Sequence, residues 1–244
     1  MVNNWYVMIL AYAVALFFGI CCVALYDTVS DRKNQKKLTF IDRFWIEKMF
    51  DYDPYALVDE LSSRAEILPP RLLITRDVTD NAYVQYTNDG WVIVIAYSFC
   101  VQGKNMMECV VSHELGHIIN GKHADLAYLA HLVCMICGLF SVFLFLNLAI
   151  FFFSLEFLAF ALYRFLEKKD EFDADRSGAF LLNDPWRYYY TLENFSKIPR
   201  TSRHSLFAKF ACFFLDTHPS MKKRAQYIGK ILARSYSNRS GRHA

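Results

Sequence analysis

Hydrophobic residues in this 244-residue chain gather in two long apolar runs separated by mixed segments. Residues 5–26 carry no charged side chain and are long enough to cross a bilayer as one helix. A second run covers residues 126–163 and is interrupted by Glu156. As one helix it would exceed the hydrocarbon layer of about 30 Å, whereas two helices turning near Asn147 would fit. We therefore predict an N-terminal transmembrane anchor and a transmembrane helical hairpin, with a soluble-core hairpin as the alternative.

Shorter patterns between these runs predict further helices. Residues 38–49 place apolar side chains at helical spacing, which predicts a helix lying on the membrane or packed on a globular domain. Residues 54–68 predict a second helix that Pro69-Pro70 ends. A third helix is expected over residues 105–122, with Asn105 as its N-cap and Glu108 at the capping-box position.

A small antiparallel β-sheet is expected between these helices. Residues 71–75 are a strand candidate. Residues 82–87 and 91–97 flank Asn88-Asp89-Gly90, which is a strong signal for a β-hairpin. The predicted fold class is therefore mainly α with a small antiparallel β-sheet.

The third predicted helix carries His113-Glu114-Leu115-Gly116-His117. Residues four apart share one face of a helix, so His113 and His117 can offer two imidazole nitrogens to one ion. Glu114 lies one step round the helix, within reach of a water held by that ion. This H-E-x-x-H pattern is typical of zinc peptidases.

Zinc needs a third protein ligand, and the spacing leaves two candidates. His123 follows His113 at the metzincin spacing, although Asn120 occupies the position of the usual glycine. The rival is Glu171, which shares a helical face with Asp175; Glu171 would bind the metal while Asp175 accepts a hydrogen bond from a ligand imidazole. A solvated acidic helix end is the structural alternative for this pair. From the residues alone, both candidate ligands stay open.

Two further segments are candidates for binding and catalysis. His218 precedes Pro219 and is therefore displayed at a turn before a helix, where it could hydrogen-bond an oxyanion with Arg224 orienting it. A surface loop is the alternative. Zinc peptidases commonly bind an extended substrate along a sheet edge. We assign that edge to Trp91, Val92, Ile93, Val94, Ile95 and Ala96, with a purely structural strand as the alternative.

Composition and charge indicate the compartment and exclude one class of partner. The chain is 55% hydrophobic, and its net charge of +3 is spread along the sequence, which does not indicate nucleic-acid binding. No basic residue precedes the first run, whereas Lys and Arg follow it and flank the hairpin on both sides. This asymmetry predicts an integral membrane protein whose catalytic domain faces the cytoplasm. The seven cysteines show no disulfide framework, as expected for a reducing compartment.

Together these motifs resemble the membrane zinc peptidases that include HtpX-type quality-control proteases and the CAAX prenyl protease. The resemblance covers roughly residues 68–224. It lies in the H-E-x-x-H of residues 113–117, the E-x-x-x-D of residues 171–175 with Gly178-Ala179, and His218-Pro219 with Arg224. Asn81-Ala82-Tyr83 also resembles the segment that precedes the edge strand in that family. The resemblance implies a zincin-like domain of gluzincin type, with Glu171 as the third ligand and His218 assisting transition-state stabilisation.

The expected function is that of a membrane-bound zinc endopeptidase acting on misfolded or membrane-proximal polypeptides. In this hypothesis His113, His117 and Glu171 hold Zn²⁺, Glu114 is the base, Asp175 orients a ligand imidazole, and His218 and Arg224 stabilise the oxyanion. The alternatives are a non-proteolytic membrane sensor or assembly factor that retains a zinc site, and a metzincin that uses His123. The expected partners are a polypeptide substrate and the lipid bilayer; the sequence does not define an oligomeric state.

The motifs also predict the order of domains along the chain. The expected parts are an anchor (1–28), a helical linker (29–68), a first catalytic part (69–125), a hairpin (126–166), a second catalytic part (167–234) and a disordered tail (235–244). Both membrane crossings of the hairpin are needed in this scheme, because a single crossing would place His113 and Glu171 on opposite sides of the bilayer.

Overall fold

The described part of this computed structural model comprises residues 39–76, 81–121, 124–144, 146–197 and 219–240. The chain divides into two compact units, Met1–Thr39 and Phe40–Ala244, and the elements below belong to the second. The anchor predicted over residues 5–26 lies outside the described residues, as do His123 and His218. The described elements are mainly helical, as the sequence predicts.

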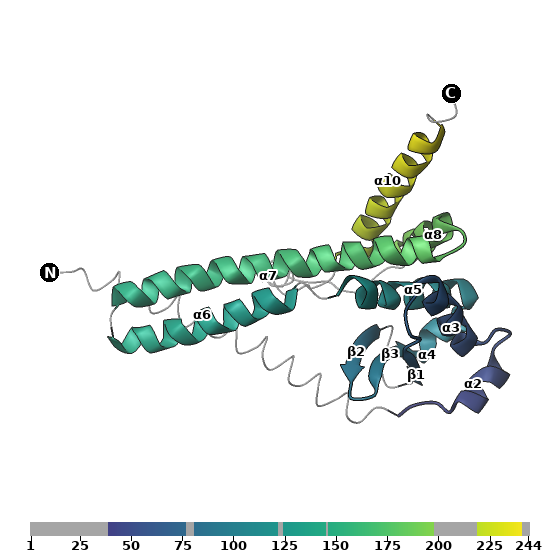
Figure 1. Ribbon diagram of the computed structural model, residues 1–244, viewed down its shortest axis with the longest axis horizontal. Coiled ribbons are helices and arrows are strands. Elements are labelled where there is room, and N and C mark those ends of the chain that lie inside the picture. The colour runs from purple at the N-terminus through teal and green to yellow at the C-terminus, as the bar shows by residue number, and fades with distance from the viewer. Residues whose placement is uncertain (1–38, 77–80, 122–123, 145, 198–218, 241–244) are drawn as a thin grey trace. The chain divides into compact units, whose positions relative to one another are not determined.

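Three strands form a mixed sheet in the order β1-β3-β2 (Figure 1). β1 (Arg71–Thr75) runs parallel to β3 (Gly90–Ala96), and β2 (Ala82–Thr87) runs antiparallel to it. The predicted hairpin between β2 and β3 is present, and Gly90 closes it at a φ of 107°, which favours glycine. The prediction of a purely antiparallel sheet is wrong, because β1 reaches β3 through a connection that includes β2 rather than through a hairpin turn.

The central position of β3 corrects the assignment of the substrate edge. Trp91 to Ala96 pair with β2, β1 or both. The backbone N–H and C=O groups of β3 are therefore used in pairing with its neighbouring strands and are not open to a substrate. In the described ranges, the outer side of β1 is partly covered, because Ile41 N–H donates to the Ile74 oxygen at 2.8 Å. The edge that no described strand covers therefore belongs to β2.

Local sequence explains where several helices begin. Before α2 (Arg43–Met49), α3 (Pro54–Arg64) and α8 (Pro185–Ser196), an aspartate side chain accepts a hydrogen bond from the backbone N–H two residues ahead. Proline opens α3 and α8, where its missing N–H costs no helical hydrogen bond. The remaining short or C-terminal helices are α4 (Tyr97–Val101) and α10 (Met221–Ser240).

The helix that carries the H-E-x-x-H motif, α5 (Lys104–Asn120), begins differently from the prediction. Its N-cap is Gly103, at a φ of 95°, and no side chain caps it, so the assignment of Asn105 as the cap is wrong. Glu108 is buried and accepts a hydrogen bond from Arg187 Nη1 of α8 at 2.6 Å, instead of closing a capping box. The helix ends at Gly121, whose N–H donates to the His117 oxygen at 3.1 Å.

α5 packs against more than one part of the fold. It contacts the sheet and α3, and it also packs along α7 (Leu146–Leu181) (Figure 1). Met107, Val111 and Leu115 of α5 are fully buried, together with Ile74, Ile93 and Ile95 of the sheet. Burying such side chains stabilises the fold by about 1.5 to 3 kcal/mol each, which fixes the helix against the sheet. The polar face of α5 is thereby turned toward α7.

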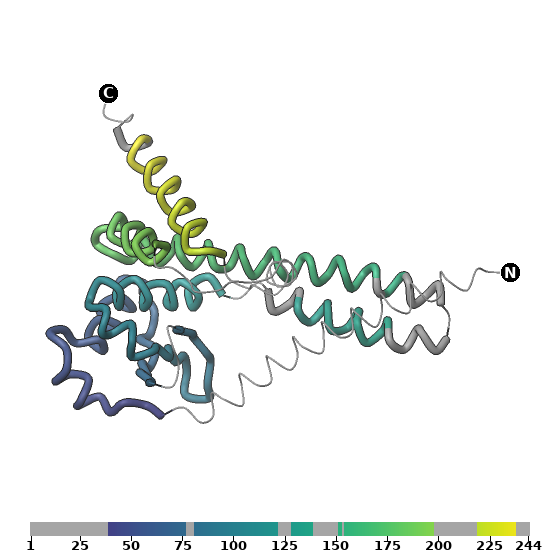
Figure 2. The backbone as a smooth tube through the Cα atoms, turned by 180° about the vertical axis from the view of Figure 1, so that it is seen from behind, coloured from purple at the N-terminus to yellow at the C-terminus, as the bar shows by residue number. Residues whose placement is uncertain are grey.

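α6 (Ala124–Leu144) and α7 lie side by side as a helical hairpin (Figures 1 and 2). α6 ends at Leu144 and α7 begins at Leu146, close to the turn predicted near Asn147. α7 then continues beyond its contact with α6 and packs along α5. Its 36 residues span about 54 Å at 1.5 Å per residue. α7 is thus part of the hairpin with α6 and also part of the core formed by α5 and the sheet.

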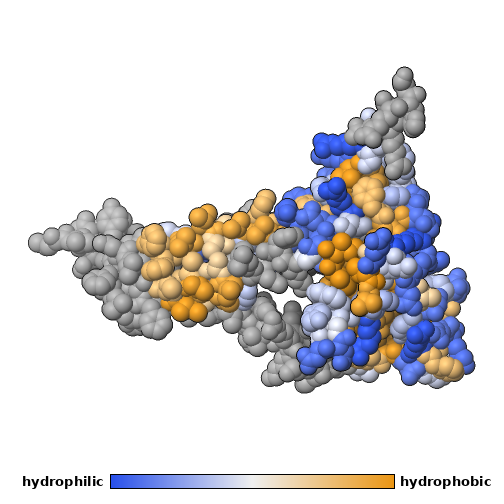
Figure 3. Space-filling view, viewed as in Figure 1, coloured by the Kyte–Doolittle hydropathy of each residue, from blue (hydrophilic) through white to orange (hydrophobic). Residues whose placement is uncertain are grey.

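The hairpin is apolar outside and holds a polar pair inside. Figure 3 shows hydrophobic residues on the visible face of the coloured part of this hairpin. The exposed large apolar side chains of the hairpin are Leu129, Val133, Ile136, Phe151, Leu155, Phe157, Leu158, Leu162 and Phe165. His131 Nδ1 lies 2.7 Å from Glu156 Oε1, and both side chains are buried, so the carboxylate that interrupts the apolar run faces protein. Within the described ranges, none of the helices combines the length and apolar character that a membrane crossing needs.

Candidate metal centre

Two imidazoles from α5 form one side of the candidate site. His113 and His117 are one helical turn apart, and their Nε2 atoms approach to 3.2 Å. Their ring centroids are 4.7 Å apart, and the ring planes meet at 75°. Only 12% and 14% of these side chains is exposed, respectively, so the Nε2 atoms face a largely dry site.

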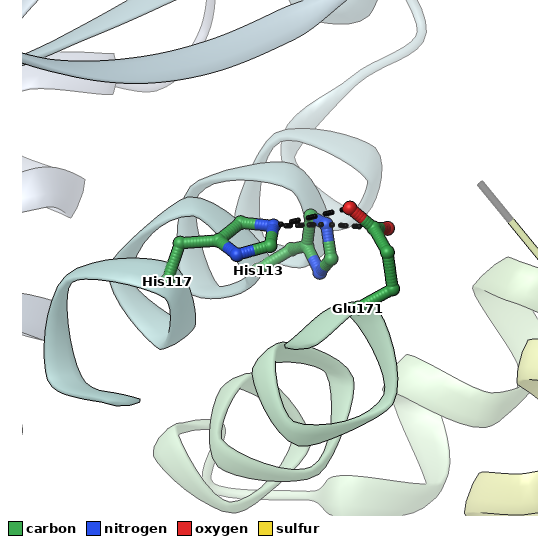
Figure 4. Close-up of side chains that lie close together, drawn as sticks. All are labelled: His113, His117 and Glu171. Carbon is green, nitrogen blue, oxygen red and sulfur yellow. Dashed lines mark hydrogen bonds and ion pairs between the residues drawn. The ribbon is translucent and has the colours of Figure 1, made fainter. Parts of the chain in front are cut away.

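Glu171 of α7 provides a carboxylate opposite the two imidazoles (Figure 4). Its Oε2 lies 3.5 Å from His113 Nε2, and its Oε1 lies 3.4 Å from His117 Nε2. The side chain is 7% exposed. The three donor groups thus converge on one point between α5 and α7.

The spacing of the three groups fits a tetrahedral metal ion. Ligands about 2.0 to 2.2 Å from a tetrahedral ion lie about 3.3 to 3.6 Å from one another. The two Nε2 atoms, 3.2 Å apart, are close to this edge, and each imidazole has a different oxygen of Glu171 at 3.4 or 3.5 Å. One donor atom from each of the three residues lies within 4.8 Å of the other two. Two imidazoles and a carboxylate also form a ligand set that leaves a fourth position for water or substrate. These residues therefore fit a catalytic metal site.

Asp175 lies one turn after Glu171 and supports His113 from the side away from the other ligands. Its Oδ1 is 3.1 Å from His113 Nδ1. Arg224 binds the same carboxylate through two hydrogen bonds, from Nε at 2.8 Å and from Nη2 at 2.5 Å. Burial alone would raise the pKa of Asp175, but the charge of Arg224 and the bonds to His113 and Arg224 lower this pKa to about 2. Asp175 is therefore an ionised acceptor that can hold the Nδ1 proton of His113.

The same contacts determine the charge of His113 in the metal-free protein. Burial and the Arg224 charge both lower its pKa, whereas hydrogen bonds to Asp175 and Glu171 raise it. The carboxylates prevail and raise the pKa of His113 to about 9. His113 therefore carries a second proton near neutral pH until an ion replaces that proton at Nε2.

Arg224 lies in the interior and contacts three members of the site. It is 6% exposed, and its Nη1 is 3.6 Å from Glu171 Oε2. Its Nη2 is 3.1 Å from His113 Nδ1 in addition to the bond with Asp175. We predicted that Arg224 orients His218, which lies outside the described residues. The contacts that are described direct this guanidinium to Asp175 and Glu171.

Tyr188 of α8 also lies at the site, although no sequence motif points to it. Its side chain is fully buried, and its hydroxyl donates to Asp175 Oδ1 at 2.7 Å. The hydroxyl oxygen is also 3.5 Å from His113 Nδ1. Burial and the nearby Asp175 charge raise the pKa of Tyr188 well above its usual value, so this hydroxyl stays a donor. In the sequence, Tyr188 stands in an aromatic run, residues 186–192, which is typical of a packed helix.

Two other predicted site residues, Glu114 and Asn81, lie on different elements. Glu114 follows His113 on α5 and is 4% exposed. Asn81 immediately precedes β2, and its carbonyl oxygen accepts a hydrogen bond from Ala96 N–H at 2.9 Å. Asn81 thus extends the pairing of β2 with β3.

A helix with two imidazoles and a glutamate, facing a second helix with a carboxylate, defines the arrangement of a metal-dependent hydrolase. Comparison with known proteins agrees. The chain matches the sequence profile described as Peptidase family M48 over residues 55–232, which is more than half of its length. The chain belongs to this peptidase family. Membership of the family supports the conclusion that the protein is a hydrolase of the metallopeptidase type.

Individual relatives cover nearly the whole chain. A protein named "Protease HtpX homolog" from Helicobacter pylori (strain Shi470) is 23% identical over 255 aligned positions, covering 92% of this chain and 80% of the relative. The protein of the same name from Helicobacter pylori (strain J99 / ATCC 700824) is 24% identical over the same shares. That from Helicobacter acinonychis (strain Sheeba) is 23% identical over 92% of this chain and 81% of the relative. The chain is therefore HtpX-like.

Proposed function

We propose that this metallopeptidase is a membrane-bound, zinc-dependent endopeptidase that cleaves misfolded or membrane-proximal polypeptides. The observation that carries the proposal is the convergence of His113, His117 and Glu171, whose donor atoms lie close enough together to bind one ion. Membership of a peptidase family supports hydrolysis of peptide bonds as the reaction.

In the proposed mechanism, His113 and His117 bind through Nε2 and Glu171 through its carboxylate. A zinc ion held by these residues would supply a Lewis acid that makes water easier to deprotonate. Glu114 takes a proton from the attacking water and later delivers it to the leaving amine nitrogen. Asp175 keeps the remaining His113 proton on Nδ1, so that Nε2 stays available as a ligand atom. His218 is proposed to donate a hydrogen bond to the oxyanion, on the basis of its His-Pro motif alone.

An extended substrate would bind along β2. This strand has the edge that no described strand covers, and it contacts α5, which carries the metal ligands. Backbone groups on an open edge can pair with a polypeptide regardless of its sequence. Such pairing would suit an enzyme that acts on unfolded chains.

The membrane location is a proposal that rests on charge and apolar surface. Basic residues after residues 5–26 and on both flanks of the hairpin support a catalytic domain on the cytoplasmic side. The apolar outer face of α6 and α7 supports contact of the hairpin with lipid. A catalytic core joined to this hairpin by α7 would meet polypeptides close to the bilayer.

Replacing the proposed base tests the reaction directly. The variant Glu114→Gln removes the proton acceptor but none of the three ligands, so it should retain zinc and lose cleavage of unfolded casein by a factor of about 10² or more. Zinc content by mass spectrometry and casein cleavage by gel give the two readouts. A Glu114→Gln variant with wild-type cleavage would disprove the role of Glu114.

The same assay separates the alternatives. A non-proteolytic sensor or assembly factor would bind zinc but cleave neither casein nor a membrane protein in its wild-type form. A metzincin-type site would lose zinc in the His123→Ala variant and keep it in Glu171→Ala. The short distances from Glu171 to both imidazoles support the gluzincin-type site over the metzincin-type site.

A further inference from the structure

The backbones of α5 and α7 approach each other closely beside the metal ligands. A Cβ atom at Gly116 would lie 2.3 Å from the Ala174 oxygen, and one at Gly178 would lie 2.7 Å from the Ser112 oxygen. Both distances are too short for any side chain, so each helix contributes a glycine that lets the other helix approach. Gly116 lies between the two imidazoles, and Ala174 immediately precedes Asp175.

Asn120 joins the same two helices at the last turn of α5. Its Nδ2 donates to the Gly116 oxygen at 2.7 Å, to the Asp173 oxygen at 3.1 Å and to Ser177 Oγ at 3.0 Å. Ser177 Oγ is also 3.3 Å from Asn120 Oδ1, so the two side chains form a reciprocal contact. One amide therefore fixes the end of α5 to the stretch of α7 that carries Glu171 and Asp175.

Ending the helix does not require this amide. Gly121, at a φ of 69°, closes α5 through its own backbone hydrogen bond. The Asn120 side chain is turned instead toward α7, where it meets a main-chain carbonyl and a hydroxyl. Its contacts span residues 173 to 177, on both sides of Asp175.

We infer that Asn120 is a positioning residue for the metal centre, because it sets the distance between α5, with its two imidazoles, and α7, with its carboxylates. The inference rests on the proposed metal site. Gly116 and Gly178 permit the close approach, and Asn120 supplies the directional bonds that select one relative position. A functional centre needs its groups held within about 0.5 Å, so a small shift of α7 would move Glu171 out of range.

The test compares Asn120→Ala with Tyr52→Phe in the full chain. Tyr52 donates a tertiary hydrogen bond to the Cys100 oxygen at 3.0 Å, and it contacts none of the metal ligands. Zn²⁺ affinity is measured by competition with a chromophoric chelator, and the stability of the metal-free protein by chemical unfolding. Asn120→Ala should weaken Zn²⁺ binding by about 10- to 100-fold, whereas Tyr52→Phe should leave it within twofold of wild type.

A second probe reports geometry rather than affinity. Co²⁺ alone, added to the metal-free protein, gives visible absorption that depends on the ligand arrangement. Asn120→Ala should change the position or intensity of these bands, and Tyr52→Phe should not. Ser177→Ala removes the reciprocal contact with Asn120 but keeps the Asn120 bonds to the Gly116 and Asp173 oxygens. It should give a smaller loss of Zn²⁺ affinity, which provides a milder variant if Asn120→Ala does not fold.

Two results would overturn the inference. One is wild-type Zn²⁺ affinity in Asn120→Ala, or in Ser177→Ala where that variant replaces it. The other is an equal loss of affinity in Tyr52→Phe, which would show that any lost tertiary hydrogen bond has this effect. Glu171→Ala separates this inference from the proposed function: if Glu171→Ala binds Zn²⁺ like wild type, the metal centre itself is wrongly assigned.

Discussion

At the scale of single residues, Asp175 organises the site. Its carboxylate accepts hydrogen bonds from Tyr188 and Arg224 and lies against His113 Nδ1. Removing this buried carboxylate would leave the buried Arg224 charge with only its longer contact to Glu171, at 3.6 Å, and such a loss of a buried partner is destabilising. Asp175 therefore fixes the orientation of His113 and also compensates a buried cation.

The raised pKa of His113 predicts a pH dependence of metal binding. In the metal-free fold this pKa is about 9, above the usual 6.5, so His113 binds an extra proton below pH 9. Zinc binding must displace that proton, and the apparent affinity should therefore rise by about tenfold per pH unit between pH 7 and 9. Above pH 9 His113 no longer carries the extra proton, so its deprotonation should add no further increase in zinc affinity. Competition with a pH-buffered chelator measures this slope.

The control for this slope is Asp175→Asn. An amide in place of the carboxylate removes a hydrogen bond and a charge that raise the pKa of His113. The rise in affinity should then end at a lower pH. A zinc affinity that is constant from pH 7 to 9 in the wild-type protein would contradict the assignment.

Individual site residues differ in how far the sequence predicts them. His113 and His117 need only helical geometry to share a face, so their spacing is sufficient. Glu171 follows His117 by 54 positions, and no local rule connects them; the E-x-x-x-D resemblance was needed to prefer it. Tyr188 lies among other aromatic residues, and nothing in its neighbours indicates which hydroxyl reaches a carboxylate.

At the scale of elements, the order of the strands decides where substrate can bind. The β2–β3 hairpin follows from Asn88-Asp89-Gly90, because that turn is local. The parallel pairing of β1 with β3 is not local, and the sequence pattern contains no information about which side of the hairpin β1 joins. The predicted edge was therefore placed on the central strand.

The alternation of an antiparallel ladder identifies the open backbone groups of β2. Asn81 faces β3, because its oxygen accepts a hydrogen bond from Ala96 N–H. Bonded and non-bonded pairs alternate, so Tyr83, Gln85 and Thr87 also face β3, whereas Ala82, Val84 and Tyr86 direct their backbone groups to the open edge.

Tyr86 provides the test of this edge, because its side chain is 71% exposed and its N–H is directed outward. Tyr86→Pro removes that N–H, whereas the matched variant Tyr86→Ala removes the side chain alone. We expect kcat/KM for a peptide substrate to be about five- to tenfold lower in Tyr86→Pro than in Tyr86→Ala, which corresponds to one lost hydrogen bond of about 1 kcal/mol. Equal values would exclude β2 N–H groups from substrate binding.

At the scale of the whole described unit, α7 joins the hairpin to the candidate metal centre. The same helix carries Glu156 in the hairpin and Glu171 at the site. The two are 15 residues apart, about 22 Å along the helix axis. The packing of α6 on α7 therefore contributes to the stability of the element that supplies the third ligand.

The buried pair in the hairpin gives a test of this packing. His131→Leu leaves the Glu156 carboxylate without its partner in an apolar interior and should destabilise the protein by about 3 kcal/mol or more. The double variant with Glu156→Leu removes both polar groups and should recover most of the loss. Denaturant unfolding in detergent compares the three proteins. A double variant as unstable as His131→Leu would show that the pair does not act as a unit.

The most direct test of the central claim is the zinc content of purified protein, measured by mass spectrometry in wild type and in the Glu171→Ala variant. The matched control is Glu167→Ala, which removes a carboxylate one turn earlier on α7. We predict about one zinc per chain in the wild type and in Glu167→Ala, and a loss of most of the zinc in Glu171→Ala. Full zinc content in Glu171→Ala would contradict the claim that Glu171 shares one ion with His113 and His117.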